Sequence, residues 1–141
     1  MKKILSLICA ILFTNSLVLA YQDFHLNGFQ YIVIDNGSVA VWNCYNNQDT
    51  VIIPDVVTFN NVKYTVVEIA GGAFWGKDYI VSVIIPSTVT SIGESAFREC
   101  ENLSSVVMPN SITNIGSAAF WGCPNLTSFT IPDSVTHIGA A

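Results

Sequence analysis

Positively charged side chains are scarce in this 141-residue sequence. Five Lys and Arg residues stand against ten Asp and Glu residues, and the formal net charge is −5. Removal of the N-terminal leader described below, which carries Lys2 and Lys3, would leave three cations and a net charge of −7. An acidic, cation-poor surface argues against nucleic acids and anionic lipids as partners.

The residue patterns that catalysis or metal binding usually requires are also absent. The two histidines, His25 and His137, have no acid or nucleophile at a motif spacing. The sequence contains no Gly-rich phosphate loop and no paired cysteine motif of the zinc type. Glu94, Glu99 and Glu101 lack the alternating Asp pattern of a calcium loop, which favours a solvated edge over a weak cation site. We therefore predict no enzyme activity, no cofactor and no metal centre.

The sequence has one long apolar run, at its N-terminus. A basic start precedes the run at residues 4–13, and a small-residue cleavage site follows at residues 18–20. This is the pattern of a secretory signal peptide. A membrane anchor is the alternative, but polar residues 14–16 interrupt the run, which falls short of the roughly 20 residues that span a bilayer. We expect residues 1–20 to be removed and the chain from Tyr21 to be exported without membrane insertion.

A 23-residue unit dominates the second half of the chain. It occurs as VIIPSTVTSIGESAFRECENLSS at residues 83–105 and as VVMPNSITNIGSAAFWGCPNLTS at residues 106–128, and a third copy, FTIPDSVTHIGAA, begins at residue 129. Eleven of the 23 positions are identical between the two complete copies. A unit this short cannot bury its own apolar face, so the copies must stack as a solenoid with one continuous core.

Each repeat position has a structural task. Val83 and Ile85 should point inward from a short parallel strand that Pro86 ends, and Val89 and Ile92 should point inward from the opposite wall. The equivalent apolar residues in the later copies are Val106, Met108, Ile112 and Ile115, and then Phe129, Ile131, Val135 and Ile138. The spacing repeated in the three copies therefore predicts one continuous row of apolar side chains, the apolar spine, along the stack.

Glycines and phenylalanines complete the unit. Gly93, Gly116 and Gly139 mark a bend, where the backbone needs either a positive φ or a close approach to the next coil. Phe97 and Phe120 should close successive coils at a turn, with one phenyl ring stacked over the next.

The pattern C-x-x-L-x-x-V-x-M-P-x-x-I-x-x-I-G-x-x-A-F resembles the BspA-like, or Treponema-pallidum-type, class of leucine-rich repeats over residues 69–141. The resemblance implies a β-rich solenoid whose 23-residue leucine-rich repeats carry short parallel strands. It also implies an exported or surface protein that adheres to host proteins, extracellular matrix or other cells. No catalytic residues come with the motif, because nearly every matching position serves packing.

Residues 21–68 resemble the N-terminal cap of such proteins. Strands at residues 29–34 and 39–44 flank an Asn-Gly step at Asn36 that signals a reversal, which predicts a β-hairpin. A strand at residues 50–53 follows, and then a second hairpin at residues 56–67 inserted into an atypical first coil. We expect this inserted hairpin to cover the open end of the stack.

Two repeated sets of exposed residues are candidate binding surfaces. Trp75, Arg98 and Trp121 follow the core aromatic position at steps of 23, so stacking should place Arg98 within cation–π reach of both indoles. A self-contained ladder over the core edge is the alternative to a stripe that binds sugar rings or a protein loop. The second set is the flat, uncharged outward face of the strands, which is either an interaction surface or a solvated sheet: Ser82, Ile84, Ser105, Val107, Ser128 and Thr130.

Three cysteines, Cys44, Cys100 and Cys123, follow the leader. Cys100 and Cys123 share a repeat position, and stacking would bring their Cα atoms to about 5 Å, inside the disulfide window. Parallel Cβ vectors keep the sulfur atoms too far apart for an unstrained bond, which favours buried thiols.

The N-glycosylation pattern occurs three times, at Asn36, Asn102 and Asn125.

The sequence predicts a secreted or cell-surface leucine-rich-repeat protein that binds a protein partner, with a glycan as a further candidate partner. One alternative is a structural spacer for a missing C-terminal region, and another is a carbohydrate-binding surface that uses Trp75 and Trp121. The third copy stops at Ala141, two residues before the next aromatic is due at position 143. We therefore expect an incomplete solenoid whose final coil exposes apolar surface.

Overall fold

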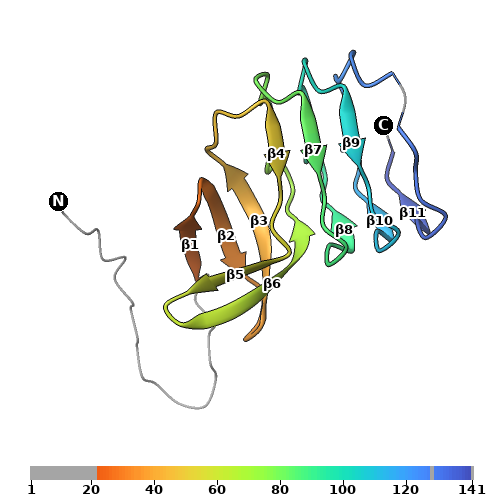
Figure 1. Cartoon of the computed structure of the whole chain (residues 1–141). Coiled ribbons are helices and arrows are strands. Elements are labelled where there is room, and N and C mark those ends of the chain that lie inside the picture. Colours follow the sequence, from red (N-terminus) through yellow and green to blue (C-terminus); the bar gives the residue numbers. More distant parts are fainter. Residues whose placement is uncertain (1–21, 128, 141) are drawn as a thin grey trace.

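The computed structural model describes residues 22–127 and 129–140, which form strands and turns (Figure 1). The expected signal peptide, its cleavage site and Ser128 lie outside the described residues. Within residues 22–127 and 129–140, no helix has the length and apolar character needed to cross a membrane.

The described strands form two sheets. The larger sheet has the order β1-β2-β3-β6-β8-β10-β11, with β5 paired to β6 beside this path, and the smaller sheet has the order β4-β7-β9. The bounds are β1 Asp23–Leu26, β2 Phe29–Val33, β3 Ser38–Cys44, β4 Thr50–Ile52, β5 Val56–Phe59, β6 Val62–Ile69, β7 Ser82–Ile84, β8 Ser91–Ile92, β9 Ser105–Val107, β10 Asn114–Ile115 and β11 His137–Ile138.

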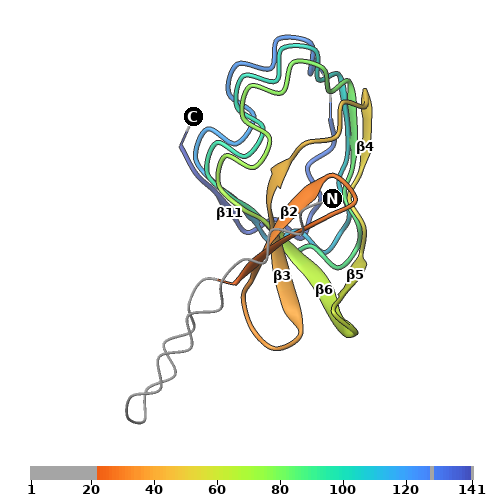
Figure 2. The ribbon, with the colours of Figure 1, turned by 90° about the vertical axis from the view of Figure 1, so that its left-hand side faces the viewer.

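The 23-residue period sets the register of both sheets. Val83 on β7 pairs in parallel with Val106 on β9, and Ile92 on β8 pairs in parallel with Ile115 on β10. Each complete copy thus supplies one strand to each sheet. In the view turned by 90° from Figure 1, successive coils lie one behind another (Figure 2). The solenoid and its parallel strands are confirmed, but the sequence did not predict that the opposite wall is also a parallel sheet.

The predicted apolar spine lies between the two sheets. Val83, Ile85, Val89 and Ile92 are all buried. The rings of Phe74 and Phe97 stack with centroids 4.8 Å apart, and those of Phe97 and Phe120 with centroids 5.3 Å apart. In the third copy, Ile131 and Ile138 are 43% and 61% exposed.

Close backbone approach explains the repeated glycines. A Cβ atom on Gly93 would lie 2.4 Å from the backbone nitrogen of Gly71, and one on Gly116 would lie 2.4 Å from that of Glu94. Gly139 is equally crowded, against Ser117. The glycines with positive φ are others, at positions 28, 72, 76 and 122. Of the two explanations left open by the sequence, close approach is confirmed and positive φ is wrong for these three glycines.

Antiparallel strands cover the start of the larger sheet. β2 and β3 pair as predicted, and β5 and β6 form the predicted hairpin. β1, which the sequence analysis missed, pairs with β2 and ends the sheet path. β1, β2 and β3 extend the sheet, while β5 lies beside the path and stacks Phe59 on Phe24 with centroids 4.4 Å apart. That the inserted hairpin covers this end of the stack stays a prediction.

Side-chain ladders join successive coils. The hydroxyls of Thr90, Thr113 and Thr136 each donate to a backbone carbonyl 23 residues earlier, at 3.2–3.4 Å. The amides of Asn102 and Asn125 donate to the carbonyls of the residues 24 positions earlier, at 2.6 and 2.7 Å. These ladders explain why Thr recurs in all three copies and Asn in the two complete copies, a task that the repeat pattern alone does not reveal.

Candidate functional site

Trp75, Arg98 and Trp121 form a stacked set that we call the Trp–Arg–Trp ladder. The Arg98 guanidinium carbon lies 5.0 Å from the Trp75 ring centroid and 4.5 Å from the Trp121 ring centroid. The cation–π geometry predicted from the repeat spacing is therefore confirmed. Both indoles are 51% exposed, so half of each side chain remains available to solvent. An exposed contact of this kind contributes about 0.5–1 kcal/mol.

Glu99 holds the ladder together from an unusual backbone position. Gly76, Glu99 and Gly122 occupy the same place in successive coils, with φ of +64°, +58° and +75°. A residue with a Cβ is disfavoured in this left-handed region by roughly 1–2 kcal/mol. The Glu99 carboxylate accepts hydrogen bonds from the Trp75 indole N–H at 2.9 Å and from Arg98 Nε at 3.2 Å.

The electrostatics of Glu99 follow from these contacts. The indole hydrogen bond from Trp75, and then the hydrogen bond and charge of Arg98, hold the pKa of Glu99 below its usual value of 4.5. The carboxylate is therefore charged at neutral pH and keeps Arg98 Nε in place. The sequence predicts only a solvated acidic edge at Glu99 and gives no sign of its role in the ladder.

The predicted strand face is only partly formed as expected. Ile84 and Val107 are exposed on adjacent strands β7 and β9, with Ser82 beside Ser105 in register. Thr130 is exposed but belongs to no strand, and Ser128 lies outside the described residues. The third strand is instead β4, which pairs with β7 and adds Thr50 and the exposed Ile52. Thr130 therefore does not extend this sheet, whereas the part of the predicted face at Ser128 stays a prediction.

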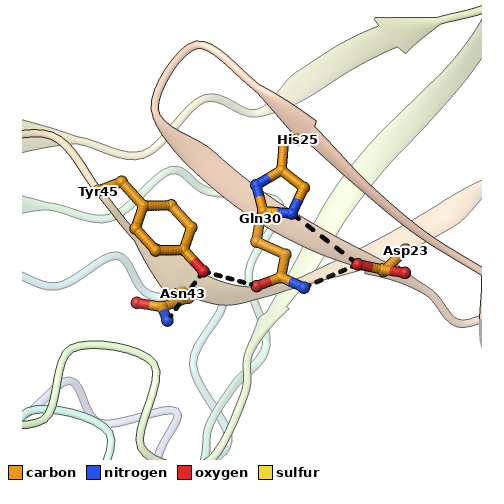
Figure 3. A network of polar contacts seen from close by, with 5 residues as sticks. All are labelled: Asp23, His25, Gln30, Asn43 and Tyr45. Carbon is orange, nitrogen blue, oxygen red and sulfur yellow. Dashed lines mark hydrogen bonds and ion pairs between the residues drawn. The ribbon is translucent and has the colours of Figure 1, made fainter. Parts of the chain in front are cut away.

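A third surface escaped the sequence analysis. On the outward side of β1, β2 and β3, hydrogen bonds link four polar residues, and a fifth, His25, lies with its Nε2 atom 4.0 Å from Asp23 Oδ2; we call this set the cap network (Figure 3). Its members are Asp23, His25, Gln30, Asn43 and Tyr45. They come from non-repeated strands, and their proximity depends on cross-strand pairing of His25 with Gln30 and of Gln30 with Asn43.

The three cysteines are free thiols that lie wholly or partly inside the core. Cys100 Sγ donates to the carbonyl of Phe74, and Cys123 Sγ donates to the carbonyl of Phe97, each at 3.0 Å. Burial raises the pKa of Cys100 to about 12. Separate backbone acceptors for the two thiols support the expectation of buried thiols in the spine.

The three glycosylation patterns differ in accessibility. The amide nitrogens of Asn102 and Asn125 donate to carbonyls of the preceding coil, so a glycan at either nitrogen would compete with a ladder bond. Asn36 lies exposed in the turn between β2 and β3.

For metal binding, residues 22–127 and 129–140 contain no group of three or more His, Cys, Asp or Glu side chains that could hold an ion.

Comparison with known proteins identifies relatives of the repeat region. The family described as the BspA type leucine rich repeat region (6 copies) matches residues 67–141. A leucine rich cell surface protein from Faecalibacterium prausnitzii is 32% identical with a TM-score of 0.79, over 86% of this chain and 33% of its own. No curated protein shows significant similarity to the chain.

Two further solved structures have the same fold. The leucine rich repeat protein of T. pallidum is 28% identical with a TM-score of 0.73, over 84% of this chain and 54% of its own. A leucine-rich repeat protein from Bacteroides capillosus is 28% identical with a TM-score of 0.78, over 82% of this chain and 86% of its own. The chain therefore spans about a third of the Faecalibacterium protein and about half of the T. pallidum protein.

Proposed function

The chain belongs to the BspA-type leucine-rich repeat family, and from this premise we propose that it is an exported adhesion protein that binds a protein partner and catalyses no reaction. The Trp–Arg–Trp ladder is the observation that carries this proposal. Its two tryptophans are 51% exposed, although the core beneath them is already closed by the stacked phenylalanines.

The composition and rigidity of the ladder favour a binding role over a self-contained packing role. Tryptophan and arginine are the residue types most enriched among the energetic centres of protein interfaces. Stacking and the Glu99 hydrogen bonds order all three side chains beforehand, which lowers the entropy cost of binding. Backbone strain of the kind found at Glu99 tends to persist at functional sites.

Export and surface location rest on the leader predicted at residues 1–20 and on family membership. The Faecalibacterium relative is described as a cell surface protein, which supports the same location for this chain. A spacer role and a carbohydrate-binding role for Trp75 and Trp121 remain the competing functions. Both lead to results different from those expected in the experiment below.

The test uses the chain without residues 1–20 on an array of extracellular-matrix proteins, host surface proteins and glycans. We expect capture of a protein ligand, and we expect the Trp75→Ala/Trp121→Ala double variant to weaken that capture at least about ten-fold. An Ile34→Thr/Val62→Thr variant, at exposed hydrophobic residues outside both candidate binding surfaces, is the control and should bind normally.

Three outcomes would contradict the proposal. Unchanged capture by a folded double tryptophan variant would remove the ladder as the binding surface. Binding of glycans alone through the tryptophans would favour the carbohydrate function. Absence of any captured ligand would favour the spacer.

A further inference from the structure

We propose that the cap network is a second binding site, separate from the Trp–Arg–Trp ladder, for the neutral, hydroxyl-rich sugar rings of a glycan. Its hydrogen bonds form a chain with one direction (Figure 3). Asn43 Nδ2 donates to the Tyr45 hydroxyl at 3.3 Å, that hydroxyl donates to Gln30 Oε1 at 3.0 Å, and Gln30 Nε2 donates to Asp23 Oδ2 at 2.7 Å. The orientation of both amides is therefore set before a ligand arrives.

The network retains hydrogen-bonding capacity on its solvent side. Each amide nitrogen carries two N–H groups, and the network uses one at Gln30 and one at Asn43. The contacts of Asp23 within the network both involve Oδ2, which leaves Oδ1 as an acceptor. Acceptor and donor groups thus alternate along one face. Sugar hydroxyls match such a face because each hydroxyl both donates and accepts.

Aromatic rings flank these polar groups. The Tyr45 ring, 53% exposed, lies 5.6 Å from the His25 ring, with Lys77 Nζ 5.8 Å from its centroid. Trp42 is 45% exposed and precedes Asn43 at the point where the β2–β3 register shifts. A β-bulge of this kind commonly re-aims a side chain beside a functional site. The indole offers an apolar surface on which the C–H face of a sugar ring can pack.

Charge restricts the class of sugar. Asp23 supplies a carboxylate to the network, and the chain as a whole carries more acidic than basic residues. Although Lys77 lies beside the Tyr45 ring, the Asp23 carboxylate would repel uronic and sialic acids at its end of the network, whereas neutral sugars meet no such repulsion. A role in stabilising the fold does not account for the cap network, because exposed polar contacts contribute little to the free energy of folding. The core of the cap is formed by residues on the opposite side of the same strands, Phe24, Phe29 and Tyr31.

The experiment combines a glycan array with an NMR titration of the ¹⁵N-labelled chain without residues 1–20. We expect binding of neutral but not acidic glycans, with shift changes at β1, β2 and β3. Gln30→Ala, which removes the centre of the hydrogen-bond chain, should weaken binding at least about ten-fold. Tyr45→Phe retains the ring and should weaken it less, whereas Trp75→Ala on the ladder should have no effect.

The outcomes separate this site from the proposed protein-binding function. Failure of the wild-type chain to bind any neutral glycan, or shift changes at the ladder alone, would overturn the proposal. Unchanged glycan binding by folded Gln30→Ala would do the same. Loss of protein capture in Gln30→Ala without glycan binding by the wild type would assign the network to a protein partner. The wild-type shift map localises the site even if a variant does not fold.

Discussion

The positive-φ positions of the coil show how single residues depart from the repeat. Gly72, Ser95 and Ala118 occupy one such position at steps of 23, and Gly76, Glu99 and Gly122 occupy a second. Glycine is the residue that takes this conformation without a steric cost. The coil that carries Arg98 has serine and glutamate instead, and the glutamate side chain accepts hydrogen bonds from Arg98 itself and from one of its two stacking partners, Trp75. The hydrogen bonds that fix Trp75 and Arg98 thus offset the steric cost of the positive φ at Glu99.

Glu99 makes the ladder sensitive to acid. Its pKa lies lower in the folded chain than in the unfolded chain, so its contribution to stability is present above pH 4.5 and is lost as the pH falls through the folded value. We expect tryptophan fluorescence to change with a midpoint below pH 4.5 while the fold, followed by circular dichroism, persists. Glu99→Gln should remove this transition, and a Glu101→Gln control should retain it. An unchanged midpoint in Glu99→Gln would contradict the assignment.

Tyr31 carries a polar group that the core does not satisfy. Its hydroxyl is buried and has no hydrogen-bond partner among the described residues, and burial raises its pKa. Tyr31→Phe should leave stability unchanged or raise it by about 1 kcal/mol, because the ring keeps its contacts with Phe24 and Phe29. Tyr31→Ala, the control for the ring itself, should cost about 3–5 kcal/mol. Urea denaturation measures both, and a clear loss in Tyr31→Phe would indicate a bonded hydroxyl.

At the scale of the element, periodic features were predictable and unique contacts were not. The 23-residue period predicted the parallel strands, the phenylalanine stack and the position of Arg98 between indoles, because identical positions must superimpose in stacked coils. The cap network has no such repetition. It depends on the short strand β1 and on the register shift beside Trp42, and neither follows from the Asn-Gly signal that predicted the pairing of β2 with β3.

The close contact between coils at Gly116 predicts a position where no side chain is tolerated. A Cβ atom there would lie 2.4 Å from a backbone nitrogen, and backbone cannot move aside as a flexible side chain can. Gly116→Ala should therefore destabilise the chain by about 1–3 kcal/mol or more. Gly37→Ala is the matched control, because its Cβ would meet only the Asp35 carboxylate, at 4.0 Å. Thermal melts showing equal stability for the two variants would contradict this account.

At the scale of the whole molecule, the chain is close to one-dimensional. Each coil contacts the coils before and after it, so local stability depends on the number of neighbours and on their burial. Three equivalent amides test this directly: Gly93, Gly116 and Gly139 donate to Ile69, Ile92 and Ile115 at 2.7, 2.8 and 2.8 Å. Their hydrogen bonds are thus nearly identical, while their positions along the stack differ.

Native-state hydrogen exchange should rank these amides by position. Gly93 lies between coils on both sides, whereas Gly139 follows β11, whose two residues are exposed, including Ile138 at 61%. Local opening should therefore require least free energy at Gly139, more at Gly116 and most at Gly93. Exchange measured by NMR on the chain without residues 1–20 gives the three values in one experiment. Equal protection would mean that the chain opens only as a single cooperative unit, from β1 to β11, and that nearest-neighbour stacking does not govern its stability.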